Sequence, residues 1–560
     1  MQNTPPAQPS SDNSAPGGAP PSDSATVTYN AATEYSNSSA AELLDETYTS
    51  DLGGQNALLV SSGATVILTN PTITKSGDES SESSDFYGTN AAVLAADGQL
   101  SIDGGSITTS GSHANAVFSY GEGNIVVKNT TITTSANNSG GIMVTGGGTL
   151  TANDVTVTTS GNSSAAIRSD RGGGTMTITG GSYSTSGVGS PAVYSTANIS
   201  VSGAELTSTA SEGVVIEGSN SVTLSGVTLV DTNTTLNGNS ETYKNIFIYQ
   251  SMSGDAEEGT GTFSAQSSTL TTNQGDSFYV TNTTAKIALS NNVINNADST
   301  GAFLRAESSK WGTTGANGGH VTLDFSNQVA EGDIVLDSIS TLSFTLSNSS
   351  FFRGAINTSS SAQSVSLKLD ATSTFVLTAD TYLTSLDNAD SANSNIYSAG
   401  HTLYVNGVAV ATNTSTAPAT PEVSLTTSAS TFDATEPVVE TSSSTSSSAS
   451  SPDYLPYLIA GGAGLGIILV VVLLVIFLRK NKAPKTPASP IQPASASPFP
   501  PQSLDSSSLP PVPPVNTPPA FPTNNPPVPP AANSSPTPVP NPVTPPINDP
   551  SSLETPKQPS

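Results

Sequence analysis

Short stretches in which apolar and polar residues alternate recur along the first three fifths of the chain. TITKS occupies 72–76, SITTS 106–110, TITTS 131–135, TVTTS 156–160 and SYSTS 182–186. Their central residues are separated by 34, 25, 25 and 26 positions, and ELTST at 205–209 and VTLVD at 227–231 follow with spacings of 23. These central residues are Ile73, Ile107, Ile132, Val157, Tyr183, Leu206 and Leu229. Alternation with a period of two predicts β-strands that bury one face.

Two further strand patterns recur in the same phase. The second reads AAVLAAD at 91–97, NAVFSY at 115–120, GGIMVTG at 140–146, SAAIRSD at 164–170 and PAVYST at 191–196. The third lies between the other two and reads LSIDGG, NIVVKN, LTANDV, MTITGG and NISVSG. Three strands in about 25 residues, separated by Gly, Asn, Asp and Ser turns, predict a solenoid whose coils pair in parallel about 4.8 Å apart. A β-sandwich would not repeat the same three strands in every unit.

This pattern resembles the right-handed parallel β-helix of pectate-lyase-like and bacterial adhesin-like surface proteins. The resemblance covers residues 50–310 well and residues 320–410 loosely. It implies an all-β fold with three strands per coil, and it says little about activity because unrelated functions share such folds. Val93, Val117, Ile142, Ile167 and Val193 share one register, so we expect them to stack inward. Residues 26–50, with the apolar run AAELLDETY, are expected to cap the first coil.

The outward neighbours of these inward residues predict a ligand-binding strip on one flat face. Its members are Phe118, Tyr120, Arg168, Asp170, Tyr194 and Glu217. Aromatic rings can stack on sugars and charged groups can hydrogen-bond to them, which predicts binding to an extracellular polysaccharide or to a host or microbial surface glycan. In the β-helix lyases that this sequence resembles, the substrate lies along such a face. The alternative is that the aromatic residues only pack against their neighbours on adjacent strands.

The predicted strip leads to the hypothesis of an adhesin-like, glycan-binding surface protein. The first alternative is a polysaccharide-active, pectate-lyase-like enzyme, and the second is a structural surface-layer component. A glycosidase needs two carboxylates roughly 5–10 Å apart. Asp170 and Glu217 lie two coils apart, or about 10 Å. No second acid completes a calcium cluster beside Asp170, and His113, His320 and His401 are isolated in the sequence. We therefore assign no catalytic residue.

Two minor patterns suggest other ligands. Outward pairs of hydroxyl residues recur at Thr72/Thr74, Ser106/Thr108, Thr131/Thr133 and Thr156/Thr158, and the pattern weakens at Ser182/Ser184 and Glu205/Thr207. Such arrays resemble those of ice-binding proteins, but Thr is also common in strands generally. Turn residues such as Asp97, Asp103, Asn153 and Asp154 could bind calcium, although turn formation explains them better in the absence of a calcium-loop spacing. No other cofactor and no metal site are expected.

One segment near the C-terminus has the length and composition of a transmembrane helix. From Leu458 to Leu478 runs LIAGGAGLGIILVVVLLVIFL, which contains no charge and as a helix spans about 30 Å, the thickness of a bilayer core. Its flanks are Tyr454 and Tyr457 on one side and Arg479, Lys480, Lys482 and Lys485 on the other. Aromatic residues favour the interface and basic residues the cytoplasm, so we expect a single-pass protein of the cell membrane with an extracellular body and a cytoplasmic tail.

The same segment raises the possibility of self-association, and its surroundings predict the remaining divisions of the chain. Gly462 and Gly466 form a GxxxG pattern that favours helix pairing, although small residues are common in such spans. Residues 1–25 are rich in Pro and Ser, predict disorder and lack the features of a secretion signal. We therefore expect a start upstream of Met1, with insertion directed by the anchor itself as the alternative. Residues 26–410 are the expected solenoid, 411–456 a Ser/Thr-rich stalk, and 479–560 a Pro-rich tail that serves as a spacer or as a ligand of aromatic grooves.

The charge and the absence of cysteine limit the partners and the source that we expect for this chain. The 560 residues carry a net charge of −28, and the part before Arg479 holds 10 basic and 40 acidic residues. Nucleic acid needs a basic surface, so it is not an expected partner. The absence of cysteine removes disulfides and thiol chemistry and, in a large extracellular protein, favours a prokaryotic source.

Overall fold

The computed structural model describes residues 27–238 and 241–425. They belong to the first of the two compact units into which the chain divides, Met1–Ser446. The expected transmembrane helix with its flanking residues and its Gly462/Gly466 pair, the Pro-rich tail, residues 1–26 and the stalk beyond 425 lie outside these ranges. Within the described ranges, no helix is both long and apolar enough to cross a bilayer.

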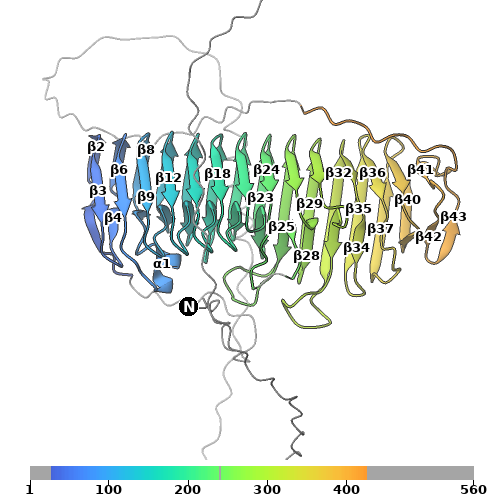
Figure 1. Ribbon diagram of the computed structural model, residues 1–560, viewed down its shortest axis with the longest axis horizontal. Helices are drawn as coiled ribbons and strands as arrows, with labels where there is room; N and C mark the ends of the chain where they lie inside the picture. The colour runs from blue at the N-terminus through green and yellow to red at the C-terminus, as the bar shows by residue number, and fades with distance from the viewer. Residues whose placement is uncertain (1–26, 239–240, 426–560) are drawn as a thin grey trace, which may run out of the picture. The chain divides into compact units, whose positions relative to one another are not determined.

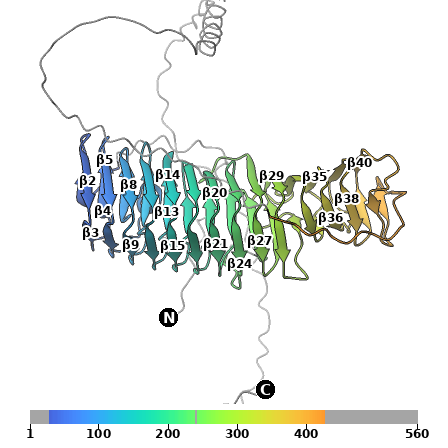
Figure 2. The same ribbon diagram turned by 90° about the horizontal axis from the view of Figure 1, so that it is seen from above.

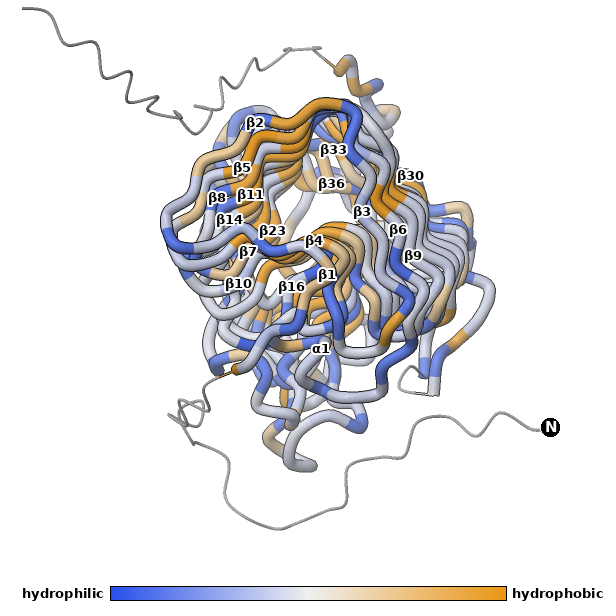
Figure 3. Tube along the Cα trace, turned by 90° about the vertical axis from the view of Figure 1, so that its left-hand side faces the viewer, coloured by the Kyte–Doolittle hydropathy of each residue, from blue (hydrophilic) through white to orange (hydrophobic). Residues whose placement is uncertain are grey.

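The described residues form a parallel β-helix, as the resemblance implies, with three sheets as its sides (Figures 1, 2 and 3). Sheet A contains β1 (Ala31–Tyr35), β4 (Asn56–Ser61), β7 (Val93–Ala96), β10 (Val117–Tyr120), β13 (Ile142–Thr145), β16 (Ile167–Ser169), β19 (Val193–Ser195), β22 (Val214–Glu217), β25 (Lys244–Tyr249), β28 (Asp276–Thr281), β31 (Leu304–Ala306) and β34 (Ile334–Leu336). Sheet C contains β3 (Thr47–Ser50), β6 (Thr72–Lys75), β9 (Ser106–Thr109), β12 (Thr131–Thr134), β15 (Thr156–Thr159), β18 (Ser182–Thr185), β21 (Glu205–Ser208), β24 (Thr228–Asp231), β27 (Thr269–Thr272) and β30 (Val293–Asn296).

Sheet B is the longest of the three, with 14 strands. They are β2 (Ala40–Leu44), β5 (Thr65–Thr69), β8 (Gln99–Asp103), β11 (Asn124–Lys128), β14 (Gly148–Asn153), β17 (Gly174–Thr179), β20 (Asn198–Ser202), β23 (Ser221–Ser225), β26 (Thr260–Gln266), β29 (Thr283–Ser290), β32 (Gly319–Ser326), β35 (Thr341–Ser347), β37 (Ser364–Leu369) and β40 (Ser385–Asn388). The only helix among the described residues is α1 (Glu82–Tyr87), between β6 and β7.

Inward residues of the three sheets meet in one continuous core, which the end-on view shows as the apolar lining of the coils (Figure 3). On sheet A, Val117 lies between Val93 and Ile142, as the sequence predicts. The row continues through Ile167 and Val193, and all five side chains are fully buried. Each such side chain contributes about 1.5–3 kcal/mol of hydrophobic stabilisation, so these rows supply most of the stability.

A single residue in the left-handed region turns the chain from sheet B to sheet C in successive coils. Asn129 and Asp154 occupy this position with φ of 50° and 52°. The backbone N–H of Asn129 donates to the carbonyl of Asn153 in the next coil at 3.0 Å, and that of Asp154 to the carbonyl of Thr179 at 2.9 Å. Asn and Asp tolerate this conformation better than most residues. The turn geometry therefore explains why Asp suits position 154.

Both ends of the solenoid depart from the regular pattern. Residues 31–50, where the sequence suggests a cap, form the first coil itself, because β1, β2 and β3 pair with β4, β5 and β6. Sheet C ends at β30 and sheet A at β34, so only sheet B continues beyond residue 336. The later strands form a four-stranded sheet D, with β33 (Val329–Glu331), β36 (Phe351–Gly354), β38 (Thr374–Leu377) and β41 (Ile396–Tyr397), and a sheet E with β39 (Thr381–Leu383), β42 (Leu403–Val405) and β43 (Val408–Val410).

Residues 411–425 run back along the later coils as an extended segment that we call the C-terminal strap (Figure 1). Asn413 pairs with the strand β41 through a hydrogen bond of 2.8 Å from its N–H to the carbonyl of Ile396. Further along, Arg353 of β36 donates to the carbonyl of Pro418 at 2.6 Å, and Asn291, before β30, donates to the carbonyl of Ser424 at 3.4 Å. The first part of the expected stalk is therefore bound to the solenoid.

Candidate functional site

Except for Asp170, which follows the end of β16, the predicted strip residues lie on the outer side of sheet A in the register that the sequence predicts. Phe118 of β10 pairs with Met143, Met143 with Arg168, and Arg168 with Tyr194. The row extends through Val215 and Phe247 to Tyr279. Tyr120 and Glu217 stand two positions further along their strands, each in the second outward row.

This row is covered and does not form the expected open strip. Phe118 is 0% exposed and Glu217 is 1% exposed, while Asp170 retains 8%. Leu94, Phe118 and Met143 belong to one small apolar cluster outside sheet A, and Val215, Phe247, Tyr249 and Tyr279 form another, with Tyr194 and Trp311 packed against it. The expectation of a flat, solvent-exposed aromatic face is wrong because long insertions between the strands fold over it.

The first insertion, residues 76–92, carries α1 and covers β7 to β13. The helix begins after Ser81, whose side chain accepts a hydrogen bond from the N–H of Ser83, and it ends at Gly88, with φ of 72°. A Cβ atom on Gly88 would lie 2.8 Å from the Phe118 ring, so this turn rests directly on the outward row. The hydroxyl of Thr145 donates to the carbonyl of Phe86 at 2.7 Å and ties the insertion to β13.

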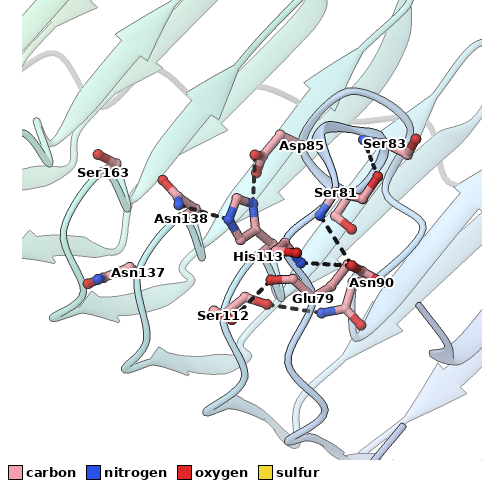
Figure 4. Close-up of polar contacts among 12 residues, drawn as sticks. Glu79, Ser81, Ser83, Asp85, Asn90, Ser112, His113, Asn137, Asn138 and Ser163 are labelled. Carbon is pink, nitrogen blue, oxygen red and sulfur yellow. Dashed lines mark hydrogen bonds and ion pairs between the residues drawn. The ribbon is translucent and has the colours of Figure 1, made fainter. Parts of the chain in front are cut away.

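A polar network holds the insertion from its side (Figure 4). Asp85 lies 2.7 Å from Nδ1 of His113, and Nε2 of His113 lies 3.0 Å from the amide of Asn138. The two ring nitrogens are therefore both engaged, and His113 is a link between α1 and the neighbouring turns. His113 is thus not isolated in space, as its place in the sequence suggests.

The second insertion, residues 250–259, covers β16 to β22. Its Ser251 hydroxyl donates to Glu217, which also accepts hydrogen bonds from Tyr194 at 2.5 Å and Tyr249 at 3.0 Å. Burial, with the charge of Glu217 next, raises the pKa of Tyr194 and of Tyr249 well above the usual value. Both phenols therefore stay protonated and donate hydrogen bonds to Glu217. With Ser251, the Glu217 carboxylate accepts hydrogen bonds from three hydroxyls.

Arg168 and Asp170 lie between the two insertions. Nη2 of Arg168 lies 3.1 Å from Asp170, and Nη1 lies 3.8 Å from Asp85. Burial raises the pKa of Asp170 to about 6, and the charge of Arg168 opposes that rise. Burial disfavours the charge of Arg168, but Asp85 and Asp170 outweigh this effect and raise its pKa. Both Asp170 and Glu217 are thus engaged in internal contacts, which gives no support to a pair of accessible catalytic carboxylates.

A different face of the solenoid is open and chemically uniform. Sheet C presents two outward rows on β6, β9, β12, β15 and β18, and a third row follows at the residue after each strand. Every position is Ser or Thr: Thr72, Thr74 and Ser76; Ser106, Thr108 and Ser110; Thr131, Thr133 and Ser135; Thr156, Thr158 and Ser160; Ser182, Ser184 and Ser186. We call these residues the Ser/Thr face.

The Ser/Thr face has no charge and mostly unengaged hydroxyls. The side chains of its first two rows make no hydrogen bond with any residue in the described ranges, and Thr131, Thr133, Thr156 and Thr158 are exposed. Strand geometry places neighbouring rows about 6.6 Å apart and successive coils about 4.8 Å apart. The in-register array that the sequence suggests is therefore present, and it includes a third row that the paired pattern did not reveal.

Known proteins offer no guide to this chain. No family model, no curated protein and no solved structure matches it. Within the described ranges, no group of three or more acidic or histidine side chains is placed to hold a metal ion. The geometry of these faces is therefore the basis for assigning a function.

Proposed function

We propose that this chain is a non-catalytic, adhesin-like protein that displays its solenoid on the cell surface and binds a neutral polysaccharide on the Ser/Thr face. The observation that supports the proposal is the uninterrupted set of Ser and Thr at every outward position of five successive strands. Hydroxyl groups both donate and accept hydrogen bonds, as do the hydroxyls of a sugar. An uncharged face also avoids the cost of desolvating ions when a neutral ligand covers it.

The regular spacing of the Ser/Thr face favours a repetitive ligand. A polymer laid along the solenoid axis would meet the same hydroxyl and methyl groups at each coil, about 4.8 Å apart. Many weak contacts then act together, because each bound unit holds the next one near the surface. This way of binding requires no exposed aromatic residues. It therefore differs from the stacking of sugars on aromatic rings that the sequence suggests for sheet A.

The proposal includes an anchor in the cell membrane. The uncharged segment Leu458–Leu478 and the basic residues that follow it support a single transmembrane helix with the solenoid outside the cell. In this arrangement the strap and the residues after it join the solenoid to the membrane.

A binding experiment with the full chain tests this function. Cells that display the chain are incubated with a panel of insoluble neutral polysaccharides, and the bound fraction is compared with that of Thr133→Lys and Ser200→Lys cells. Thr133 lies in the middle of the Ser/Thr face, and Ser200 is an exposed residue of sheet B. We expect Thr133→Lys to weaken binding by about tenfold or more, equivalent to about 1.4 kcal/mol, and Ser200→Lys to leave it unchanged.

Three results would reject the proposal. Failure of the native chain to bind any polysaccharide would favour a structural surface-layer role. Thermal hysteresis without glycan binding would assign the face to ice. Release of unsaturated or reducing sugars from a polysaccharide would favour the enzyme alternative.

A further inference from the structure

The outer side of sheet B contains a hollow of about 310 Å³ that the sequence does not indicate. It lies over β23, β26, β29 and β32, on a different sheet from the Ser/Thr face and from the covered row of sheet A. Binding sites for small ligands start at roughly 300 Å³. The hollow therefore has room for one or two sugar units.

Two rows of side chains form the hollow. Thr223, Ser264, Ala288 and Asp324 pair in order across the four strands. Ala288 has the smallest side chain of this row and provides an apolar floor between Ser264 and Asp324. In the next row, Gln266 lies between Ser225 and Ser290. An amide, a carboxylate and several hydroxyls thus surround a small apolar patch.

Three polar side chains of the hollow are not used by the fold, whereas the hydroxyl of Ser326 at its edge accepts a hydrogen bond from Asn348 at 2.9 Å. The side chains of Ser264, Gln266 and Asp324 make no hydrogen bond or ion pair with any other residue that the structure describes, and Asp324 is half-buried. Two other aspartates of the solenoid are engaged by contrast: Asp276 binds Arg305 at 2.6 Å, and Asp370 accepts from the N–H of Asn348 at 2.7 Å. Ser264 is half-buried as well, whereas Gln266 is exposed. Half-buried polar groups without partners lose part of their hydration, and a ligand can supply the missing hydrogen bonds.

From these observations we infer that the hollow is a binding site for one or two units of a neutral sugar. The carboxylate of Asp324 accepts hydrogen bonds from sugar hydroxyls, Gln266 donates and accepts, and Ala288 contacts the C–H face of the ring. Asp324 and the acidic excess of the solenoid disfavour an anionic sugar. The site is independent of the Ser/Thr face, because it lies on another sheet and would bind a short ligand rather than a polymer.

Saturation-transfer NMR with the full chain tests the site. The probes are the methyl glycosides of glucose, galactose, mannose and N-acetylglucosamine, together with methyl glucuronide as an anionic comparison. We expect transfer to at least one neutral glycoside and none to the glucuronide. Gln266→Ala and Ala288→Leu, which removes the floor, should each reduce the transfer by about tenfold or more, equivalent to about 1.4 kcal/mol.

Two controls separate this inference from the proposed function. Asp387→Asn, an exposed residue of β40 on the same sheet, and Thr133→Lys on the Ser/Thr face should both leave the transfer unchanged. A thermal melt of each variant verifies folding. No transfer to any neutral glycoside, transfer to the glucuronide alone, or transfer that persists in both Gln266→Ala and Ala288→Leu would overturn the inference, whatever the polysaccharide experiment shows.

Discussion

The guanidinium of Arg171 lies 2.6 Å from the carboxylate of Asp255, a residue 84 positions further along the chain. The Cζ atom of Arg171 also lies 4.0 Å from the centre of the Phe86 ring. One side chain therefore connects the insertion at 250–259 with the insertion that carries α1. Between them, these insertions cover the outward row of sheet A, in which Phe118, Met143 and Val215 are buried and Arg168 and Tyr194 are partly exposed.

Removal of this link should loosen both insertions without unfolding the coils. In Arg171→Gln the contact with Asp255 is lost, and because Arg171 is 36% exposed the cost to global stability should not exceed about 1 kcal/mol. Limited proteolysis should cut within 76–92 and 250–259 sooner than in the native chain. Lys368→Gln, which removes an exposed ion pair with Asp387, is the control and should leave the cleavage pattern unchanged.

The aromatic core of the later coils should be sensitive to truncation at its centre. The Phe352 ring lies 5.3 Å from that of Phe344 and 5.7 Å from that of Phe375, measured between centroids. Phe352→Ala leaves a cavity among these rings and should reduce the free energy of unfolding by about 3–5 kcal/mol. Val408→Ala changes a residue that is 66% exposed and should have little effect. Equal losses in urea denaturation for both variants would contradict this description of the core.

Asp231 should make stability depend on pH. Thr109, Thr134, Thr159, Thr185 and Ser208 precede it at the same inward position, and Thr272 follows it. Burial raises the pKa of Asp231 to about 8, so the folded state binds a proton more tightly than the unfolded state, where a carboxyl has a pKa of about 3.9. This contribution is largest below about pH 4 and is lost as pH rises towards 8.

Asp231→Thr restores the hydroxyl of the other coils and should therefore stabilise the protein most at high pH. We expect a gain of about 1–3 kcal/mol at pH 8 and a smaller gain at pH 5, where Asp231 is protonated in the folded state. Chemical denaturation at the two pH values measures the difference. The exposed variant Asp387→Asn should show no such pH dependence. A gain for Asp231→Thr that is the same at both pH values would rule out titration of Asp231 as the cause.

The strap should detach when Arg353 is replaced. Arg353 donates to Pro418 and Thr420 and forms an ion pair with Glu331 at 3.2 Å. In Arg353→Ala, hydrogen exchange of residues 411–425 should become severalfold faster, while exchange of β37 stays the same because sheet B does not contact these groups. If exchange in the strap is already complete in the native chain at the first time point, the strap is not bound in solution.

Local repetition made the coils predictable from the sequence. The rows through Val117 and Ile142 and through Phe118 and Arg168 follow from spacings of about 25 residues, because each coil pairs with the next one. The cover over sheet A is not predictable in this way. Asp85 meets Arg168 and Arg171 meets Asp255 only after the insertions fold back, and nothing in the turn-rich sequences of 76–92 or 250–259 indicates their direction.

The two proposed binding sites also differ in how far the sequence predicts them. The Ser/Thr face is visible in the sequence as TITTS-like repeats, although its third row emerges only from the stacking of Ser110, Ser135 and Ser160. The sequence alone does not reveal the sheet B hollow, because the residues that line it are separated by irregular intervals. Once the strands are aligned, the succession Thr223, Ser264, Ala288, Asp324 is the signal that could have indicated it.

A lysine scan along the second row of sheet C tests the central claim most directly. Lysine replaces Thr108, Thr133, Thr158 and Thr271 in turn, and binding of displayed full-length chain to its polysaccharide is measured. Thr271 occupies the same row on β27, beyond the interruption at Glu205 and Val230. The proposed function predicts about tenfold or greater loss at the first three positions and none at Thr271. Equal effects at all four positions, or no effect at Thr133, would contradict it.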